Sequence, residues 1–220
     1  MNHLLRSAND LMKNAQIPWA ICGGFALDLF LEKELRIHSD IDICVFEKDR
    51  EQILEYMLQN NWHVFEFRGG GKVRPLDGTL SSEVGRNFMC TNGECDIVKF
   101  YPCEEEGLLW YEFFHTGMKE FNYLEFLFNV TNEKYFVFNQ KHDIKREISK
   151  AVLFSNGIPY LALEIVLLFK ASRSENAEYQ YDFEQTYEYM DEEQKMWFCR
   201  SMDALYPNGH KWRLGEVQYE

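Results

Sequence analysis

Apolar residues near the start of the chain recur every three to four positions, which is the spacing of an amphipathic helix. The residues of this apolar face are Leu4, Leu5, Ala8, Leu11 and Met12. Pro18 ends the pattern, because proline lacks the backbone N–H that a helix interior needs. We therefore expect a helix over residues 2–16 and a short apolar strand over residues 19–22.

Helical and strand patterns alternate after this strand. The expected helices cover residues 25–31 and 49–60, and the expected strands cover residues 41–46 and 63–67. Residues 68–72 contain three glycines and are expected to form a turn. Residues 73–85 hold Pro, Gly and Ser and are expected to form a loop.

The dipeptide Asn92-Gly93 lies between two apolar runs and predicts a β-hairpin over residues 86–101. Asp96 falls near the start of the second strand of this hairpin, where an acid is unusual for a plain core strand. Glu94, two residues earlier, is the alternative acid in this strand. The expected hairpin therefore contains two acids, Asp96 and Glu94, that a plain core strand does not explain.

The pattern changes near Asn156-Gly157, which we take as a domain boundary between residues 1–156 and 157–220. The later half is expected to be helical. Its first helix is expected to open at Pro159 and to end near Lys170, with further helices over residues 175–189 and 191–205. Shorter strands are expected earlier, over residues 123–128 and 135–138. The predicted fold class is α+β, with a mixed twisted sheet flanked by helices and a C-terminal helical half.

Two acids stand at the start of the strand predicted over residues 41–46. Asp40 and Asp42 are two residues apart, so their side chains share one face of the strand. Like charges this close repel unless a cation lies between them or one keeps a proton. Magnesium is the usual cation for such oxygen ligands. The alternative is that both acids face solvent at the end of a strand.

Composition limits the partners of the protein. The chain has 220 residues and a formal net charge of −13, which argues against nucleic-acid binding because there is no excess of Lys and Arg. This charge suits a cationic small molecule, although it also aids solubility. The six cysteines form no CxxC pair, so neither zinc ligation nor disulfides are indicated. We find no signal segment and no apolar run of membrane-spanning length, and expect a cytoplasmic protein without a membrane partner.

The combination of Gly23-Gly24 with Asp40-Ile41-Asp42 on the next strand resembles the signature of the polymerase-beta-like nucleotidyltransferase superfamily. The longer strings over residues 23–31 and 36–43 are closer to one branch, the aminoglycoside 2″-adenylyltransferases and lincosamide nucleotidyltransferases. The helical half is similar to the same branch at Ile158–Ala171, Tyr181-Asp182-Phe183 and Gly209-His210-Lys211-Trp212. The chain departs from it at Tyr179, where the family commonly carries an Asp.

This resemblance implies that the chain transfers a nucleoside monophosphate, AMP from ATP, to a hydroxyl of a small cationic acceptor such as an aminoglycoside. It implies two magnesium ions held by Asp40, Asp42 and Asp96, with Asp96 completing the site or acting as the general base. The residues expected at the nucleotide are Gly23, Gly24, Arg36, His38, Ser39 and Lys170. Glu164 and Asp182 are expected at the acceptor, although Glu164 is equally compatible with a surface position.

Alternatives remain open at this point. The acceptor is a lincosamide or another metabolite in one of them, and a protein hydroxyl in another. A third is a non-catalytic or toxin–antitoxin-type module that keeps the nucleotidyltransferase fold and binds a nucleotide or protein. The oligomeric state is expected to be a monomer or a homodimer.

Overall fold

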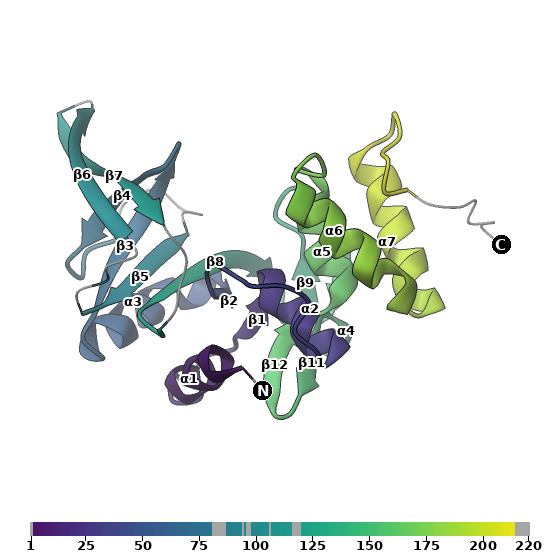
Figure 1. The fold of residues 1–220 in the computed structure, drawn as a ribbon, viewed down its shortest axis with the longest axis horizontal. Coiled ribbons are helices and arrows are strands. Elements are labelled where there is room, and N and C mark those ends of the chain that lie inside the picture. The colour runs from purple at the N-terminus through teal and green to yellow at the C-terminus, as the bar shows by residue number, and fades with distance from the viewer. Residues whose placement is uncertain are drawn as a thin grey trace. The chain divides into compact units, whose positions relative to one another are not determined.

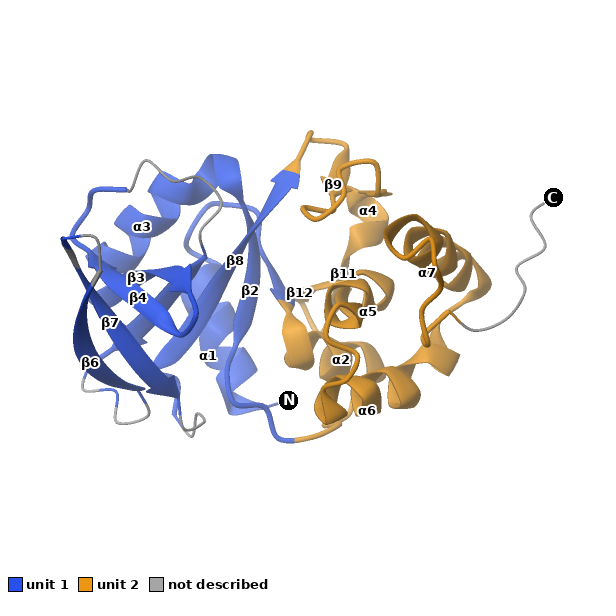
Figure 2. Ribbon diagram, turned by 90° about the horizontal axis from the view of Figure 1, so that it is seen from above, with its two compact units in different colours: residues 1–21, 37–130 blue, residues 22–36, 131–220 orange. Residues whose placement is uncertain are grey.

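The computed structural model describes residues 2–80, 87–93, 95, 98–105, 107–115 and 120–213 (Figure 1). The chain divides into two compact units, which Figure 2 shows in different colours. Unit 1 comprises Met1–Ile21 and Ile37–Val130, and unit 2 comprises Cys22–Arg36 and Thr131–Glu220. Helices and strands occur in both units, so the predicted α+β class is confirmed.

Two α-helices of unit 1 follow the predicted pattern. In α1 (His3–Met12), the Asn2 side chain accepts the backbone N–H of Leu4 at 2.9 Å and so caps the helix. Its buried side chains are Leu4, Leu5, Ala8 and Met12. Helix α3 (Arg50–Gln59) follows a short 3-10 turn, η1 (Glu47–Asp49). The hydroxyl of Tyr56 in α3 donates to the carbonyl of Leu11 at 2.6 Å, which ties the two helices together.

The sheet of unit 1 has the strand order β1-β2-β8-β5-β3-β4-β7-β6. Its strands are β1 (Ala20–Cys22), β2 (Asp42–Phe46), β3 (Trp62–Gly69), β4 (Lys72–Leu76), β5 (Phe88–Asn92), β6 (Val98–Glu105), β7 (Leu108–His115) and β8 (Tyr123–Thr131). Strands β2 and β8 run parallel, and the neighbours from β8 to β6 pair antiparallel. The sheet is therefore mixed, as predicted.

The predicted hairpin around Asn92-Gly93 is wrong. Strand β5 pairs with β3 and β8, whereas β6 pairs with β7. Long-range pairing buries Phe88, Met89 and Cys90 completely, and this burial outweighs the local turn signal. The turn over residues 68–72 is confirmed as the β3–β4 connection, but β4 extends into the segment expected to be a loop.

Unit 2 holds short strands and most of the helices (Figure 1). Its strands are β9 (Tyr135–Val137), β10 (Lys145–Glu147), β11 (Val152–Ser155) and β12 (Ile158–Leu161). Its helical elements are α2 (Gly23–Leu31), α4 (Ile148–Ala151), α5 (Leu163–Ala171), α6 (Ala177–Thr186), η2 (Tyr187–Tyr189) and α7 (Glu192–Leu205). Strands β9 and β10 pair antiparallel, as do β11 and β12.

The prediction that Pro159 opens a helix is wrong. Pro159 lies in β12 opposite Phe154, and the helix begins only at Leu163. Asn156 and Gly157 have φ values of +51° and +80°, so they form the two-residue turn of a β11–β12 hairpin. Beyond this hairpin, Trp212 is fully buried and stacks on Phe183 of α6 with ring centroids 4.6 Å apart.

Candidate active site

Two acids of unit 1 lie side by side on the parallel strands β2 and β8. Asp42 is the register partner of Glu125, and the backbone N–H of Glu125 donates to the carbonyl of Ile41 at 2.8 Å. Directly opposed residues of a sheet share a face, and Asp40, two residues before Asp42, projects to the same side. Ile41 and Ile43 point the other way and are fully buried. We call Asp40, Asp42 and Glu125 the carboxylate cluster.

Burial and one neighbouring acid both affect the protonation of Glu125. Burial raises the pKa of Glu125 to about 7, the hydrogen bond from Tyr123 opposes the shift, and the negative charge of Asp40 adds to it. The Tyr123 hydroxyl donates to Oε1 of Glu125. Burial and the charge of Glu125 also raise the pKa of Tyr123, so the phenol keeps its proton and remains a donor. Glu125 is therefore held in place by its neighbour on the same face.

The imidazole of His115 lies against Tyr123. The His115 ring stacks on Tyr123, with centroids 4.2 Å apart and planes 21° from parallel. Burial lowers the pKa of His115, although the charge of Asp40 acts in the opposite direction, so the ring is neutral near pH 7. Among the described residues, Nε2 of His115 has no hydrogen-bond partner although it is buried.

The acids of the carboxylate cluster are of the chemical type that binds a hard divalent cation. Carboxylate oxygens come from adjacent strands, and the charge of Asp40 adds to the effect of burial in raising the pKa of Glu125. Within the described ranges, no three His, Cys, Asp or Glu side chains are grouped closely enough to form a metal site. Asp96, the predicted third ligand, and Glu94, its alternative, lie outside the described residues.

The glycine pair marks the start of α2 in unit 2. Gly23 has φ +62°, a backbone conformation that favours glycine, and α2 begins at this residue. A helix N-terminus presents free N–H groups and a positive dipole end. Asp28 is buried in the same helix and accepts the backbone N–H of Leu35 at 2.9 Å, which shapes the loop after α2.

Three residues predicted to bind substrates are joined to one another in unit 2. The Arg36 Nε donates to Oδ1 of Asp182 at 2.9 Å, and Nη2 donates to Oδ2 at 3.1 Å. Nζ of Lys170 lies 3.0 Å from Oδ2 of Asp182 and 4.1 Å from the ring centroid of Tyr179. Asp182 is fully buried, and although burial would raise its pKa, Arg36 and Lys170 lower it overall. We call Arg36, Lys170 and Asp182 the ion-pair cluster.

Glu164 belongs to a second buried network in unit 2. Its Oε1 lies 2.8 Å from Nη2 of Arg146, and its Oε2 accepts Nε2 of Gln194 at 2.7 Å. Burial raises the pKa of Glu164, and Arg146 and Gln194 oppose this shift. The side chain is fully buried, so it joins α5 to β10 and α7 inside unit 2.

The two remaining predicted residues lie in unit 1, in the segment that leads to Asp40. His38 is buried, with 5% of its surface exposed, whereas Ser39 is exposed. Of the predicted site residues, the structure thus brings Asp40 and Asp42 together in unit 1, and Arg36, Lys170 and Asp182 together in unit 2.

Residues 4–73 match the model of the aminoglycoside-2″-adenylyltransferase family. The lincomycin-bound lincosamide antibiotic adenylyltransferase LnuA is 13% identical, with 83% of this chain and 93% of that chain covered and a TM-score of 0.51. ANT(2″)-Ia in complex with adenylyl-2″-tobramycin is 11% identical, with 92% and 95% covered and a TM-score of 0.50. The chain has a nucleotidyltransferase fold. The resemblance predicted from the glycine pair and the Asp-x-Asp motif is therefore confirmed.

The solution structure of ANT(2″)-Ia supports the same fold for this nucleotidyltransferase-like chain, at 12% identity and a TM-score of 0.51, with 94% of this chain and 91% of that chain covered. A comparison with curated protein sequences finds no match. None of the helices in the described ranges has the length and apolar character needed to cross a bilayer.

Sequence reasoning missed Glu125. The predicted strand over residues 123–128 is confirmed within β8, but no role was expected for its acid. The available signal was a single carboxylate in the otherwise apolar run Leu124-Glu125-Phe126. This is the same signal that singled out Asp96, and only the pairing of β8 with β2 gives it meaning.

Proposed function

We propose that this protein is a metal-dependent nucleotidyltransferase that moves a nucleoside monophosphate, AMP from ATP, onto a hydroxyl of a small acceptor. The observation that carries the proposal is the register pairing of Asp42 with Glu125 beside Asp40. Oxygen donors on one sheet face are what a reaction at a phosphate needs to hold magnesium. The match to the aminoglycoside-2″-adenylyltransferase model supports this activity.

In the proposed reaction, the acceptor oxygen forms a bond to the α-phosphorus and the bond from the α-phosphorus to the bridging oxygen breaks, releasing pyrophosphate. Two bound magnesium ions would supply charge neutralisation at the reacting phosphates. Asp40 and Asp42 would contribute ligands to these ions beside Glu125, which Tyr123 would keep in position through its hydroxyl. Asp96 remains the predicted further carboxylate, either as a ligand or as the base that takes the hydroxyl proton.

The ion-pair cluster supplies positive charge for the nucleotide in this proposal. Two cations share one buried carboxylate, so Asp182 orients Arg36 and Lys170, while the exposed Glu178 lies 3.5 Å from Nη1 of Arg36. We therefore assign Asp182 to positioning these cations and no longer to the acceptor. Gly23, Gly24, His38 and Ser39 keep their expected role at the phosphates, which the positive start of α2 supports.

The acceptor proposed first is a cationic, hydroxylated molecule of the aminoglycoside kind. The net charge of −13 and the carboxylate cluster would attract such a molecule. A lincosamide is the second candidate, because the fold is also similar to that of LnuA. A monomer or a homodimer is proposed without a nucleic-acid partner.

The test incubates the protein with magnesium, ATP and a panel of aminoglycosides and lincosamides, and measures pyrophosphate release and the mass of the acceptor. We expect acceptor-dependent release, together with an adenylylated product. The matched control is Asp42→Asn, which keeps the shape of the side chain and removes its charge. Nucleotide binding without transfer to any acceptor would contradict the proposal and favour the non-catalytic module.

A further inference from the structure

The His115 side chain is a polar group of unit 1 that neither the family match nor the predicted site explains. It lies at the end of β7 and stacks on Tyr123, whose hydroxyl donates to Glu125. Asp40 acts electrostatically on both His115 and Glu125, which places the imidazole in the field of the carboxylate cluster. His115 therefore belongs to the same local surface as the proposed metal ligands.

The Nε2 atom of His115 is buried and has no hydrogen-bond partner among the described residues. A buried polar atom without a partner is unfavourable, and native proteins keep such atoms rarely, often where a ligand will bind. The stack on Tyr123 holds the ring in one orientation, so Nε2 is presented at a fixed position. This combination indicates a binding role.

We propose that Nε2 of His115 forms a hydrogen bond with the acceptor hydroxyl that attacks the nucleotide, and so positions the acceptor beside the carboxylate cluster. This inference rests on the proposed function. A neutral imidazole offers one donor and one acceptor nitrogen, and a hydroxyl can satisfy Nε2 in either tautomer. A phosphate oxygen only accepts and would suit just one of the two tautomers. The hydroxyl is therefore the favoured partner.

Two variants distinguish the contribution of Nε2 from that of the stacked ring. His115→Phe keeps an aromatic ring that can stack on Tyr123 and deletes Nε2, whereas His115→Gln restores a polar group near the same place. We expect His115→Phe to raise the acceptor KM about three- to tenfold, as for the loss of one hydrogen bond between neutral groups. The KM for magnesium ATP should stay within twofold, and His115→Gln should recover part of the loss.

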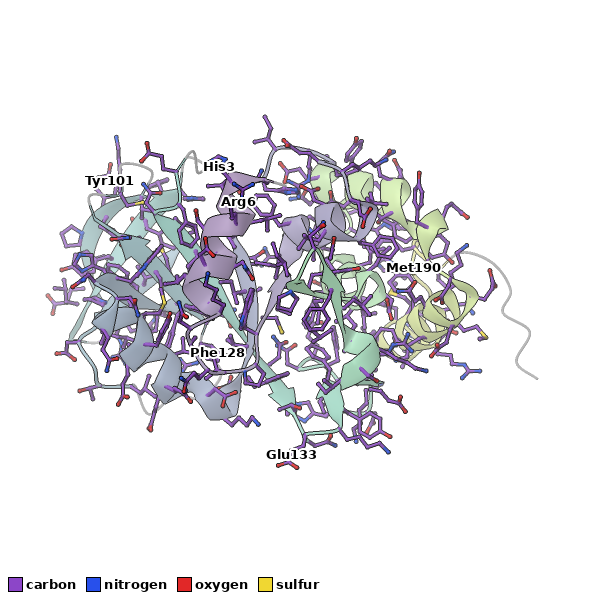
Figure 3. The ribbon with its side chains drawn as sticks, turned by 90° about the horizontal axis from the view of Figure 1, so that it is seen from below. His3, Arg6, Tyr101, Phe128, Glu133 and Met190 are labelled. Atoms are coloured by element: carbon purple, nitrogen blue, oxygen red, sulfur yellow. The ribbon has the colours of Figure 1, made fainter. Side chains whose placement is uncertain are left out.

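The matched control lies next to His115 on the same strand. Phe114 is 61% exposed, and its ring contacts Tyr101, which projects from the edge of unit 1 in Figure 3. Adjacent strand residues point to opposite faces, so Phe114→Leu should leave both KM values unchanged. Thermal unfolding of each variant checks the fold, and we expect His115→Phe to melt at the wild-type temperature or above it, because it removes a buried atom that no described residue satisfies.

A binding measurement separates this inference from the proposed function. Tobramycin and lincomycin are added, without nucleotide, to protein labelled in its six histidine rings. The ring signal that is missing from the NMR spectrum of His115→Gln is the signal of His115. We expect this signal to shift on addition of one of these two probes. If transfer fails with every acceptor but this signal shifts, the function is wrong and the contact stands. If transfer occurs while His115→Phe leaves the acceptor KM unchanged, or raises the ATP KM in its place, the inference is overturned.

Discussion

One acid in the carboxylate cluster of unit 1 and one acid in the ion-pair cluster of unit 2 have pKa values shifted in opposite directions. Glu125 lies beside Asp42 and is influenced by Asp40, and its pKa is raised to about 7, with burial as the main cause. Asp182 is fully buried between Arg36 and Lys170, and its pKa is lowered in spite of burial. Burial raises the pKa of both acids, and the cations around Asp182 reverse this effect there.

This difference distinguishes acids that stabilise the fold from acids that are suited to binding a cation. An acid whose neighbours are cations stabilises the fold, because removal of its charge leaves those cations buried without compensation. Acids that gather on one sheet face repel one another, and they are tolerated where an added cation neutralises them. The two clusters should therefore respond oppositely when one negative charge is removed from each.

The largest effect is expected from Asp42→Asn. The variant removes a ligand charge from the carboxylate cluster, and we expect kcat for transfer to fall by about a hundred- to a thousandfold. The free energy of unfolding in metal-free buffer should change by much less than the loss of kcat implies, because Asn keeps the shape of the Asp side chain. Steady-state pyrophosphate release and urea unfolding measure the two quantities. A loss of activity that merely tracks a loss of folded protein would contradict the assignment.

Asp182→Asn should cost stability. It removes the buried carboxylate that Arg36 and Lys170 share, while the exposed Glu178 stays 3.5 Å from Arg36, and we expect the free energy of unfolding to fall by about 3–5 kcal/mol at pH 7. A lowered folded-state pKa means that the wild-type carboxylate stabilises the fold above the pKa of the unfolded acid, about 3.9. The difference between the two proteins should therefore shrink as pH falls below 4 and through the folded-state pKa. Urea unfolding at a series of pH values checks this, and an equal difference at pH 3 and pH 7 would exclude a charge effect.

Glu125→Gln should show the reverse pH dependence. The raised pKa of Glu125 means that ionisation destabilises the folded, metal-free protein as pH rises from about 4.5 to 7. In buffer with a chelator, we expect Glu125→Gln to be more stable than wild type by about 1–3 kcal/mol at pH 8. The two proteins should have equal stability near pH 4, where Glu125 is protonated in both the folded and the unfolded state. A variant less stable than wild type at pH 8 would contradict the raised pKa of Glu125.

The same comparison explains how much of the site could be predicted. Asp40 and Asp42 were found because strand alternation is local, and Gly23 because a strand followed by paired glycines predicts a tight turn into a helix. Glu125 was missed because its meaning comes from the pairing of β8 with β2, which no local pattern reveals. Likewise, Arg36 and Asp182 are 146 residues apart in the chain, and their contact is visible only in the folded protein.

The errors in the fold have a related cause. Asn92-Gly93 and Pro159 are local signals for a hairpin and for the start of a helix. At β5, burial between β3 and β8 overrides the first signal, and pairing of β12 with β11 overrides the second. The α+β class was predictable because it depends on the periodicity of many residues, whereas strand order depends on contacts between distant segments.

The smallest effect is expected from an acid that has cationic neighbours but is exposed. Glu193 lies 3.0 Å from Nη1 of Arg146 and 2.6 Å from Nζ of Lys150, and 51% of its side chain is exposed. Water can solvate the cations once the acid is removed, and Arg146 keeps its buried partner Glu164 at 2.8 Å. We expect Glu193→Gln to lower the free energy of unfolding by less than about 1 kcal/mol, and by less still in high salt. Urea unfolding at low and high ionic strength measures both values. If Glu193→Gln lowered the free energy of unfolding as much as Asp182→Asn, burial would not determine how much a paired acid stabilises the fold.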